Sequence, residues 1–228
     1  MKKSYIILAA ALMLFLSALT SRAQEREDAF TIWNCVKIDK ALGKEKRWNV
    51  GLMTEYRHRI HEGVSKMDLY FVRPVVSYKA LPWLKLQYQM DFISSSSGFN
   101  WCFLPEVSMS HKVGDFTLAF RQRVLTTWVA QAGTNSSLLR SRAKVEYHIP
   151  DTPLGCYVSA EPYWCEFSKD CFAWFQKLRT HVGISIKLTD NLTFIPDYGW
   201  MAYFNHDGRY DRRTYDEHVL YFTFAVKL

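Results

Sequence analysis

The sequence predicts an all-β protein, a closed antiparallel up-and-down transmembrane β-barrel of 10 or 12 strands. Apolar and polar residues alternate with period two in segment after segment. Most of these segments are 10–13 residues long, whereas soluble strands average about 5–6 residues and tilted membrane-spanning strands need about 9–11. Short and longer polar connections alternate along the chain, as in barrels with short periplasmic turns and longer external loops.

The first residues predict export. Lys2 and Lys3 precede an apolar run at 5–19, and Ser21 and Ala23 follow it at the spacing that signal peptidase reads. The run is shorter than the roughly 20 apolar residues that a membrane-spanning helix needs. We therefore predict a signal peptide at 1–23 and a single barrel domain at 24–228.

Composition excludes several classes of protein. The formal charge is +7 for the whole chain and +4 for residues 24–228, without the Lys/Arg run of a nucleic-acid binder. Five cysteines are an odd number, which leaves at least one thiol unpaired in an oxidising compartment and does not suit a disulfide framework. Cys165 and Cys171 are the one plausible local pair. The alternative, free cysteines acting as small apolar residues, stays open. We predict no metal, no cofactor and no nucleic-acid partner.

Five segments alternate clearly, at 48–60, 84–93, 116–128, 138–149 and 177–188. Less regular segments follow the same period at 30–38, 67–80, 99–111, 155–167, 191–204 and 217–228, and prolines weaken four of them. A chain that enters and leaves from the periplasm needs an even number of spans. Either 30–38 is therefore not a barrel strand, which leaves ten, or a twelfth strand is hidden.

The content of the two faces indicates which one meets lipid. In lipid a sheet survives only when it is closed, because every backbone group needs an internal partner. A polar inner face also reconciles the mean hydropathy of −0.16 with a membrane location. Tryptophans near strand ends or on the apolar face fit an aromatic girdle: Trp48, Trp83, Trp128, Trp164 and Trp200.

Charged residues concentrate on the polar faces, which we expect to line the lumen. The predicted lumen-facing network consists of Glu55, Arg57, Arg59, Arg121, Arg123, Arg140, Arg142, Lys144, Glu146 and Arg179. With Arg73, Lys85, Lys177, Lys187, Asp91, Glu106, Glu161 and Asp197, the lumen carries twelve basic against six acidic residues. We favour an Arg–carboxylate network that fills a narrow lumen. A small pore or binding lumen that prefers anions is the other reading.

The last segment keeps its alternation to the final residue, although chain ends usually fray. Closure explains this, because a terminal strand must pair along its length. The predicted C-terminal assembly signal comprises Tyr221, Phe222, Phe224, Val226 and Leu228. It resembles the signal that the bacterial barrel-assembly machinery reads, with Leu228 in place of the usual terminal Phe.

An outer-membrane lipid-modifying hydrolase or acyltransferase is the alternative function. His58 and His218 have lipid-face parity and would be neighbours if strands 48–60 and 217–228 close the barrel. However, no strong Ser or Asp partner accompanies them, and the sequence has no G-x-S-x-G motif. We therefore predict no catalytic residues and no enzymatic activity.

The order of features resembles a known family, the outer-membrane barrels catalogued as domain of unknown function twenty-four-ninety. The similar elements are Trp33, "TEYRHR" (54–59), "FRQRV" (120–124), "LLRSRAKVEY" (138–147) and "YFTFAVKL" (221–228). The resemblance implies a barrel in the outer membrane of a Gram-negative bacterium, with no established ligand. We expect a monomer that contacts outer-membrane lipid and the assembly machinery.

Overall fold

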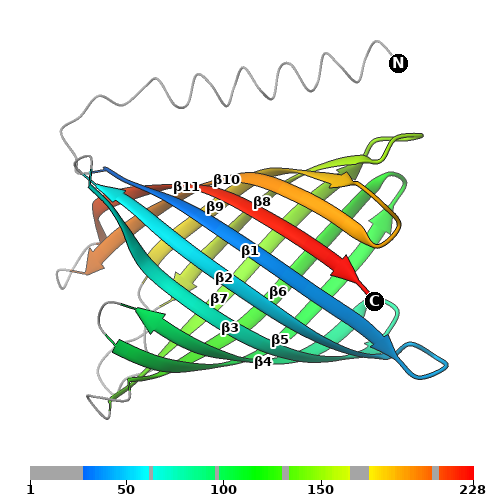
Figure 1. Cartoon of the computed structure of the whole chain (residues 1–228), viewed down its shortest axis with the longest axis horizontal. Coiled ribbons are helices and arrows are strands. Elements are labelled where there is room, and N and C mark those ends of the chain that lie inside the picture. The colour runs from blue at the N-terminus through cyan, green and yellow to red at the C-terminus, as the bar shows by residue number, and fades with distance from the viewer. Residues whose placement is uncertain (1–27, 62–63, 96–97, 130–133, 165–174, 207–210) are drawn as a thin grey trace.

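The computed structural model describes residues 28–61, 64–95, 98–129, 134–164, 175–206 and 211–228. Within these residues, eleven strands close into one barrel (Figure 1), which confirms the predicted all-β closed barrel. They are β1 (Asp28–Leu42), β2 (Trp48–His61), β3 (Val64–Leu81), β4 (Leu84–Ser95), β5 (Gly98–Val113), β6 (Phe116–Val129), β7 (Thr134–His148), β8 (Leu154–Trp164), β9 (Phe175–Lys187), β10 (Leu192–His206) and β11 (Asp211–Lys227). The predicted signal peptide and the pair Cys165 and Cys171 lie outside the described residues.

The closing seam corrects the predicted strand number and the predicted all-antiparallel topology. β1 is a full strand, and it pairs in parallel with β11 from Asp28↔Asp216 to Asp39↔Lys227. On its other edge β1 pairs antiparallel with β2. In an up-and-down sheet with an odd number of strands, the first and last strands point the same way. Closure between them is therefore parallel, and neither 10 nor 12 strands is right.

The barrel has two different ends. The turn end carries the connections at 43–47, 82–83, 114–115, 149–153 and 188–191 together with the last residue, and the opposite end, called the loop end, carries the start of β1 (Figure 1). Gly43 and Gly114 have φ of 77° and 58°, which tight turns require and glycine adopts without strain. Several strands extend further toward the loop end than predicted; β7, for example, begins at Thr134 rather than 138.

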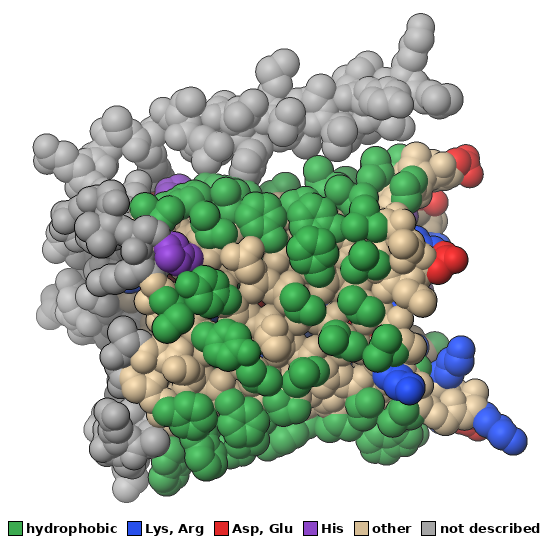
Figure 2. Space-filling model, in the orientation of Figure 1, with side chains coloured by type: hydrophobic (Ala, Val, Ile, Leu, Met, Phe, Trp, Pro, Cys, Tyr) green, Lys and Arg blue, Asp and Glu red, His purple; other side chains and the backbone are tan. Residues whose placement is uncertain are grey.

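Period-two burial assigns the two faces of the sheet. In β5, Cys102, Leu104 and Glu106 are buried while Trp101 and Val107, which have the opposite parity and flank them, are exposed. Apolar side chains cover the outer surface in Figure 2, with Lys, Arg, Asp and Glu gathered at the turn end. The interior therefore holds the buried polar groups of this protein. No helix in the described ranges is long and apolar enough to cross a membrane.

Four strands contain a proline, and each tolerates it in the same way. Pro74 pairs with Leu52 of β2, while the pairing of β3 with β4 skips from Val72↔Phe92 to Val75↔Gln89. Pro105, Pro162 and Pro196 likewise keep one ladder and interrupt the ladder on their other edge. A proline removes one backbone donor, so one seam loses its regularity while the strand persists.

The end of the chain is held on both sides. The backbone N–H of Leu228 donates to the carbonyl of Asp39 at 2.9 Å, and that of Lys227 donates to Asn191 at 2.8 Å. Phe224 also stacks on Phe194 of β10 with ring centroids 4.8 Å apart. The alternation of the final residues therefore corresponds to a strand that is paired along both edges.

Candidate functional site: the barrel lumen

The residues predicted to line the lumen lie on the inner faces of four strands. Glu55, Arg57 and Arg59 come from β2, and Arg179 comes from β9. The remainder come from β6 and β7, which pair with each other: Arg121, Arg123, Arg140, Arg142, Lys144 and Glu146. Each shares the parity of a buried residue on its own strand. Their functional role remains a prediction, but their placement defines the site.

Two carboxylates on β4 and β5 hold guanidinium groups in the middle of the lumen. Asp91 accepts two hydrogen bonds from Arg73, one of them at 2.7 Å. Glu106 accepts from Arg123, with 2.8 Å between Nε and Oε2. All four side chains are at most 11% exposed. The Arg73–Asp91 pair is bidentate, whereas Arg123 directs both of its hydrogen bonds to one oxygen of Glu106. Such multiply hydrogen-bonded Arg–carboxylate pairs compensate buried charges well.

Glu161 of β8 lies beside three arginines that come from three different strands. It accepts a hydrogen bond from Arg121 of β6 and another from Arg140 of β7 at 2.9 Å. Arg179 of β9 lies 3.9 Å away. The Glu161 side chain is 3% exposed. One carboxylate thus compensates several buried cations, so the network depends on it strongly.

Aromatic rings lie against the buried guanidinium groups, an arrangement that strand alternation alone does not predict. Arg57 lies over the Trp33 ring at 3.8 Å from the centroid, and Arg140 lies over Tyr163 at 4.5 Å. Arg73 similarly lies 4.6 Å from the Phe71 centroid. Such contacts stabilise desolvated cations through the ring quadrupole. Trp33 alternates with Thr31 and Cys35 on the same face of its strand, and this spacing was the sequence signal that it faces inward.

An apolar cluster fills the part of the lumen beside the closing seam. Trp33, Met201 and Val219 are buried there and pack against Tyr203 and Tyr221. The predicted polar lumen is therefore only partly polar, because one side of it is packed as an ordinary hydrophobic core. Sequence alternation identifies the inner face but does not require that every inner residue be polar.

Acidic residues near this cluster also have hydrogen-bond partners from distant strands. Glu55 accepts from the Tyr221 hydroxyl at 2.6 Å and from Arg57 at 2.7 Å. Glu217, which is not among the residues predicted to line the lumen, accepts from Thr31 at 2.9 Å and from Tyr203 at 2.7 Å. Glu217 lies two residues before the buried Val219 on the same strand, so the alternation already indicated that it faces inward. These contacts connect β1, β2, β10 and β11 through their side chains.

A second polar group lies toward the turn end. Asp197 accepts from the Tyr157 hydroxyl at 2.6 Å and lies 2.8 Å from Nδ1 of His181. Gly183 makes room for it, since a Cβ there would be 2.6 Å from both the Tyr157 ring and the Asp197 Cβ. The glycine is required by this close approach of two side chains.

The two histidines considered for catalysis are not neighbours. β1 lies between β2 and β11, with Ile32 opposite both His58 and Leu220. His218 lies 2.5 Å from the Tyr198 hydroxyl, and His58 lies 3.4 Å from that of Tyr56. They would have been neighbours only if β1 were absent from the barrel, and that condition is not met. Within the described ranges, no group of three or more His, Cys, Asp or Glu could hold a metal ion.

Comparison with known proteins identifies the family. Residues 30–214 match the family model described as Protein of unknown function (DUF2490). The chain belongs to this family. A solved structure described as a NanC porin is also similar, with 13% identity, a TM-score of 0.47, and coverage of 87% of this chain and 99% of that chain. The comparison with curated proteins finds no match.

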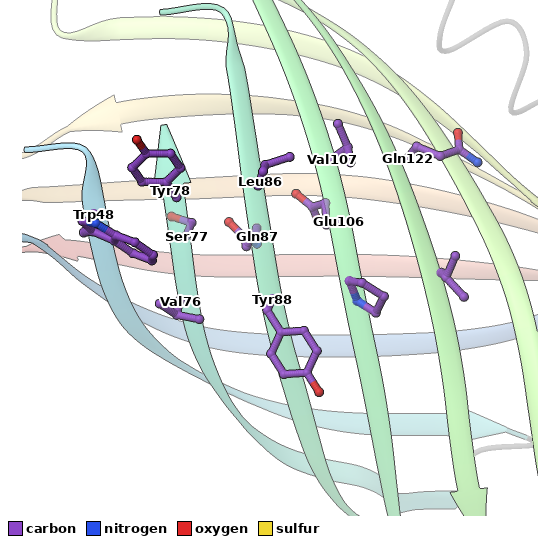
Figure 3. A pocket seen from close by; sticks show the side chains of 12 residues that line it. Trp48, Val76, Ser77, Tyr78, Leu86, Gln87, Tyr88, Glu106, Val107 and Gln122 are labelled. Carbon is purple, nitrogen blue, oxygen red and sulfur yellow. The ribbon is translucent and has the colours of Figure 1, made fainter. Parts of the chain in front are cut away.

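The outer surface of this DUF2490 barrel also has a shallow groove, of about 550 Å³. Figure 3 shows side chains around it on strands β2 to β6. Most are apolar and point outward, including Trp48, Val76, Leu86, Tyr88 and Val107. It coincides with the interrupted ladder at Pro105. The groove is apolar, in contrast with the charged lumen behind it.

Proposed function

We propose that this protein is a monomeric outer-membrane β-barrel of a Gram-negative bacterium, without enzymatic activity, whose lumen is closed by its polar core. Its outer face supports membrane residence. Large apolar residues there are 36% exposed or more, including Leu52, Leu86, Phe120 and Ile184. Removing such a surface from water favours insertion by about 25 cal/mol per Å².

Tryptophans support the same placement. Trp48 and Trp83 are exposed at the turn end, and Trp128 is exposed toward the loop end. Aromatic residues at both ends of an apolar belt are typical of barrels at the two membrane interfaces. By the same rule the turn end faces the periplasm. The groove near Trp48 then faces the bilayer, where an acyl chain suits its apolar side chains.

The observation that carries the closed lumen is the burial of its central charged groups. Asp91 and Glu161 are 3% exposed and Arg123 is 4% exposed. These side chains come from β4, β8 and β6, so they span the lumen from several directions. An open aqueous channel would leave such groups hydrated. A structural barrel is therefore favoured over the anion-leaning pore. Because basic residues outnumber acidic residues in the lumen, any residual ion flow would prefer anions.

Two measurements test the proposal. Unboiled protein in an outer-membrane fraction should migrate differently in electrophoresis from boiled protein. If migration does not change and the protein is soluble without detergent, the membrane barrel is wrong. In planar bilayers the native protein should show no steady conductance, whereas replacing Arg140 and Tyr163 together by alanine should produce channels. A steady open channel in the native protein would contradict the closed lumen.

Interaction with the barrel-assembly machinery is part of the proposal. In β11, Phe222, Phe224 and Val226 share the outer parity while Tyr221 points into the lumen. The aromatic outer face at the last strand is what supports recognition there. Replacing Phe222 and Phe224 by serine should reduce the amount of assembled barrel, measured as heat-modifiable protein, more than the same change at Phe116 and Phe120.

A further inference from the structure

Four arginines form a block on two paired strands, with too few carboxylates beside them. Arg121 lies directly opposite Arg142, and Arg123 lies directly opposite Arg140. Side chains at such positions have Cβ atoms about 4.5–5.5 Å apart, and like charges there repel. The flanking strands supply Glu106 and Glu161 to this block.

Those two carboxylates leave one guanidinium unmatched. Glu106 accepts a hydrogen bond from Arg123, and Glu161 accepts hydrogen bonds from Arg121 and Arg140. Arg142 has no hydrogen bond or ion pair with any residue in the described part of the chain. The buried Nε groups of Arg121 and Arg140 also have no acceptor among the described residues. The block therefore has surplus donors as well as surplus charge.

A further cation extends this block along the same row of the sheet. Lys85 pairs with Ser108, and Ser108 pairs with Arg121. The Lys85 ammonium donates to Gln87 at 2.9 Å and forms no ion pair within the described residues, and Glu106, Asp39 and Arg121 act on it electrostatically from further away. Lys144, by contrast, is paired with Glu146 at 2.8 Å. Lys85 and Arg142 thus have no direct ion-pair partner among the described residues beside Arg121, and the nearby carboxylates Glu106 and Glu161 are already engaged by other arginines.

We infer that Lys85, Arg121 and Arg142 form a binding site for a dianionic oxyanion, with inorganic phosphate as the simplest member of the class. Guanidinium groups present planar pairs of N–H donors that match phosphate oxygens, and the ammonium adds a point charge. Lys85 and Arg142 are partly exposed, on the turn-end side of the buried pairs. This site adds a ligand class to the proposed function. It rests on that proposal in one respect, namely that the turn end faces the periplasm, from which the anion would come.

Thermal unfolding of the full-length barrel in detergent tests the site, with sodium phosphate compared with sodium chloride at equal ionic strength. Phosphate at about ten times its dissociation constant should raise Tm by about 3–5 °C. Arg142→Gln should lose this rise, and its Tm in chloride should not fall, because the substitution removes an unpaired charge. Lys44→Gln, in the β1–β2 turn, is the matched control and should keep the full rise.

Several results would overturn the inference. These are the absence of a phosphate-specific rise in the native protein, an undiminished rise in Arg142→Gln, or an equal rise with the monoanion acetate. If Arg142→Gln does not fold, Lys85→Gln replaces it and should reduce the rise at least twofold. Bilayer conductance reports on the closed lumen independently, so the two proposals can fail separately.

Discussion

Loss of the Glu161 charge should destabilise the barrel more than loss of any other single lumen charge discussed above. Glu161→Gln keeps the size of the side chain but removes the negative charge that Arg121, Arg140 and Arg179 share. The glutamine amide can accept at one position only, and its NH₂ group would face guanidinium donors. The substitution therefore leaves buried cations without compensation.

The magnitude follows from burial. Glu161 is 3% exposed and its arginine partners are 9–12% exposed at the side chain. Removing one partner of such a buried pair costs about 3–5 kcal/mol. Glu146→Gln is the matched control, because Glu146 pairs with one lysine at 2.8 Å and both side chains are 21–24% exposed. That pair should contribute about 1 kcal/mol or less.

Denaturant unfolding in detergent, followed by tryptophan fluorescence, measures both changes in the free energy of unfolding. Adding Arg140→Gln to Glu161→Gln should recover part of the loss, since it removes one uncompensated cation. If Glu161→Gln lies within 1 kcal/mol of the native protein, or if its effect equals that of Glu146→Gln, the shared-carboxylate interpretation is refuted.

Three further predictions concern the seam, a close contact and the aromatic core. Because β1 and β11 are parallel, epitope tags placed directly before Asp28 and after Leu228 should be accessible from opposite sides of the membrane; accessibility from one side would contradict the parallel seam. Gly183→Ala should cost about 1–3 kcal/mol of unfolding free energy, since its Cβ would overlap Tyr157 and Asp197, whereas Ser185→Ala should change it little. Trp33→Leu should destabilise by about 2 kcal/mol or more through lost packing and the lost Arg57 contact, and Trp48→Leu on the outer face should have a smaller effect.

Period-two alternation was sufficient to predict the closed all-β barrel and to place the charged residues inside. A strand has only two faces, so the polar and apolar sets of β6 or β7 can be separated from sequence alone. The same alternation located all eleven segments. The predicted number of barrel strands was wrong because the parity argument assumed that both chain ends lie at the same end of the barrel.

The pairing of individual charges could not be predicted in this way. Arg121 and Glu161 are 40 residues apart, and their contact depends on the register of two intervening seams. Tyr221 reaches Glu55 across 166 residues for the same reason. Side-chain parity says that such residues share the lumen but not which of them meet.

For this protein, the sequence by itself determined which residues face inward, because the alternation of a strand is a local property. The tertiary structure decided three other matters: the parallel seam between β1 and β11, the aromatic packing around Trp33, and the excess of guanidinium groups over carboxylates at Arg142. Each depends on strand order and register around the closed barrel. These are set by the mutual packing of all the strands, so no single segment carries that information.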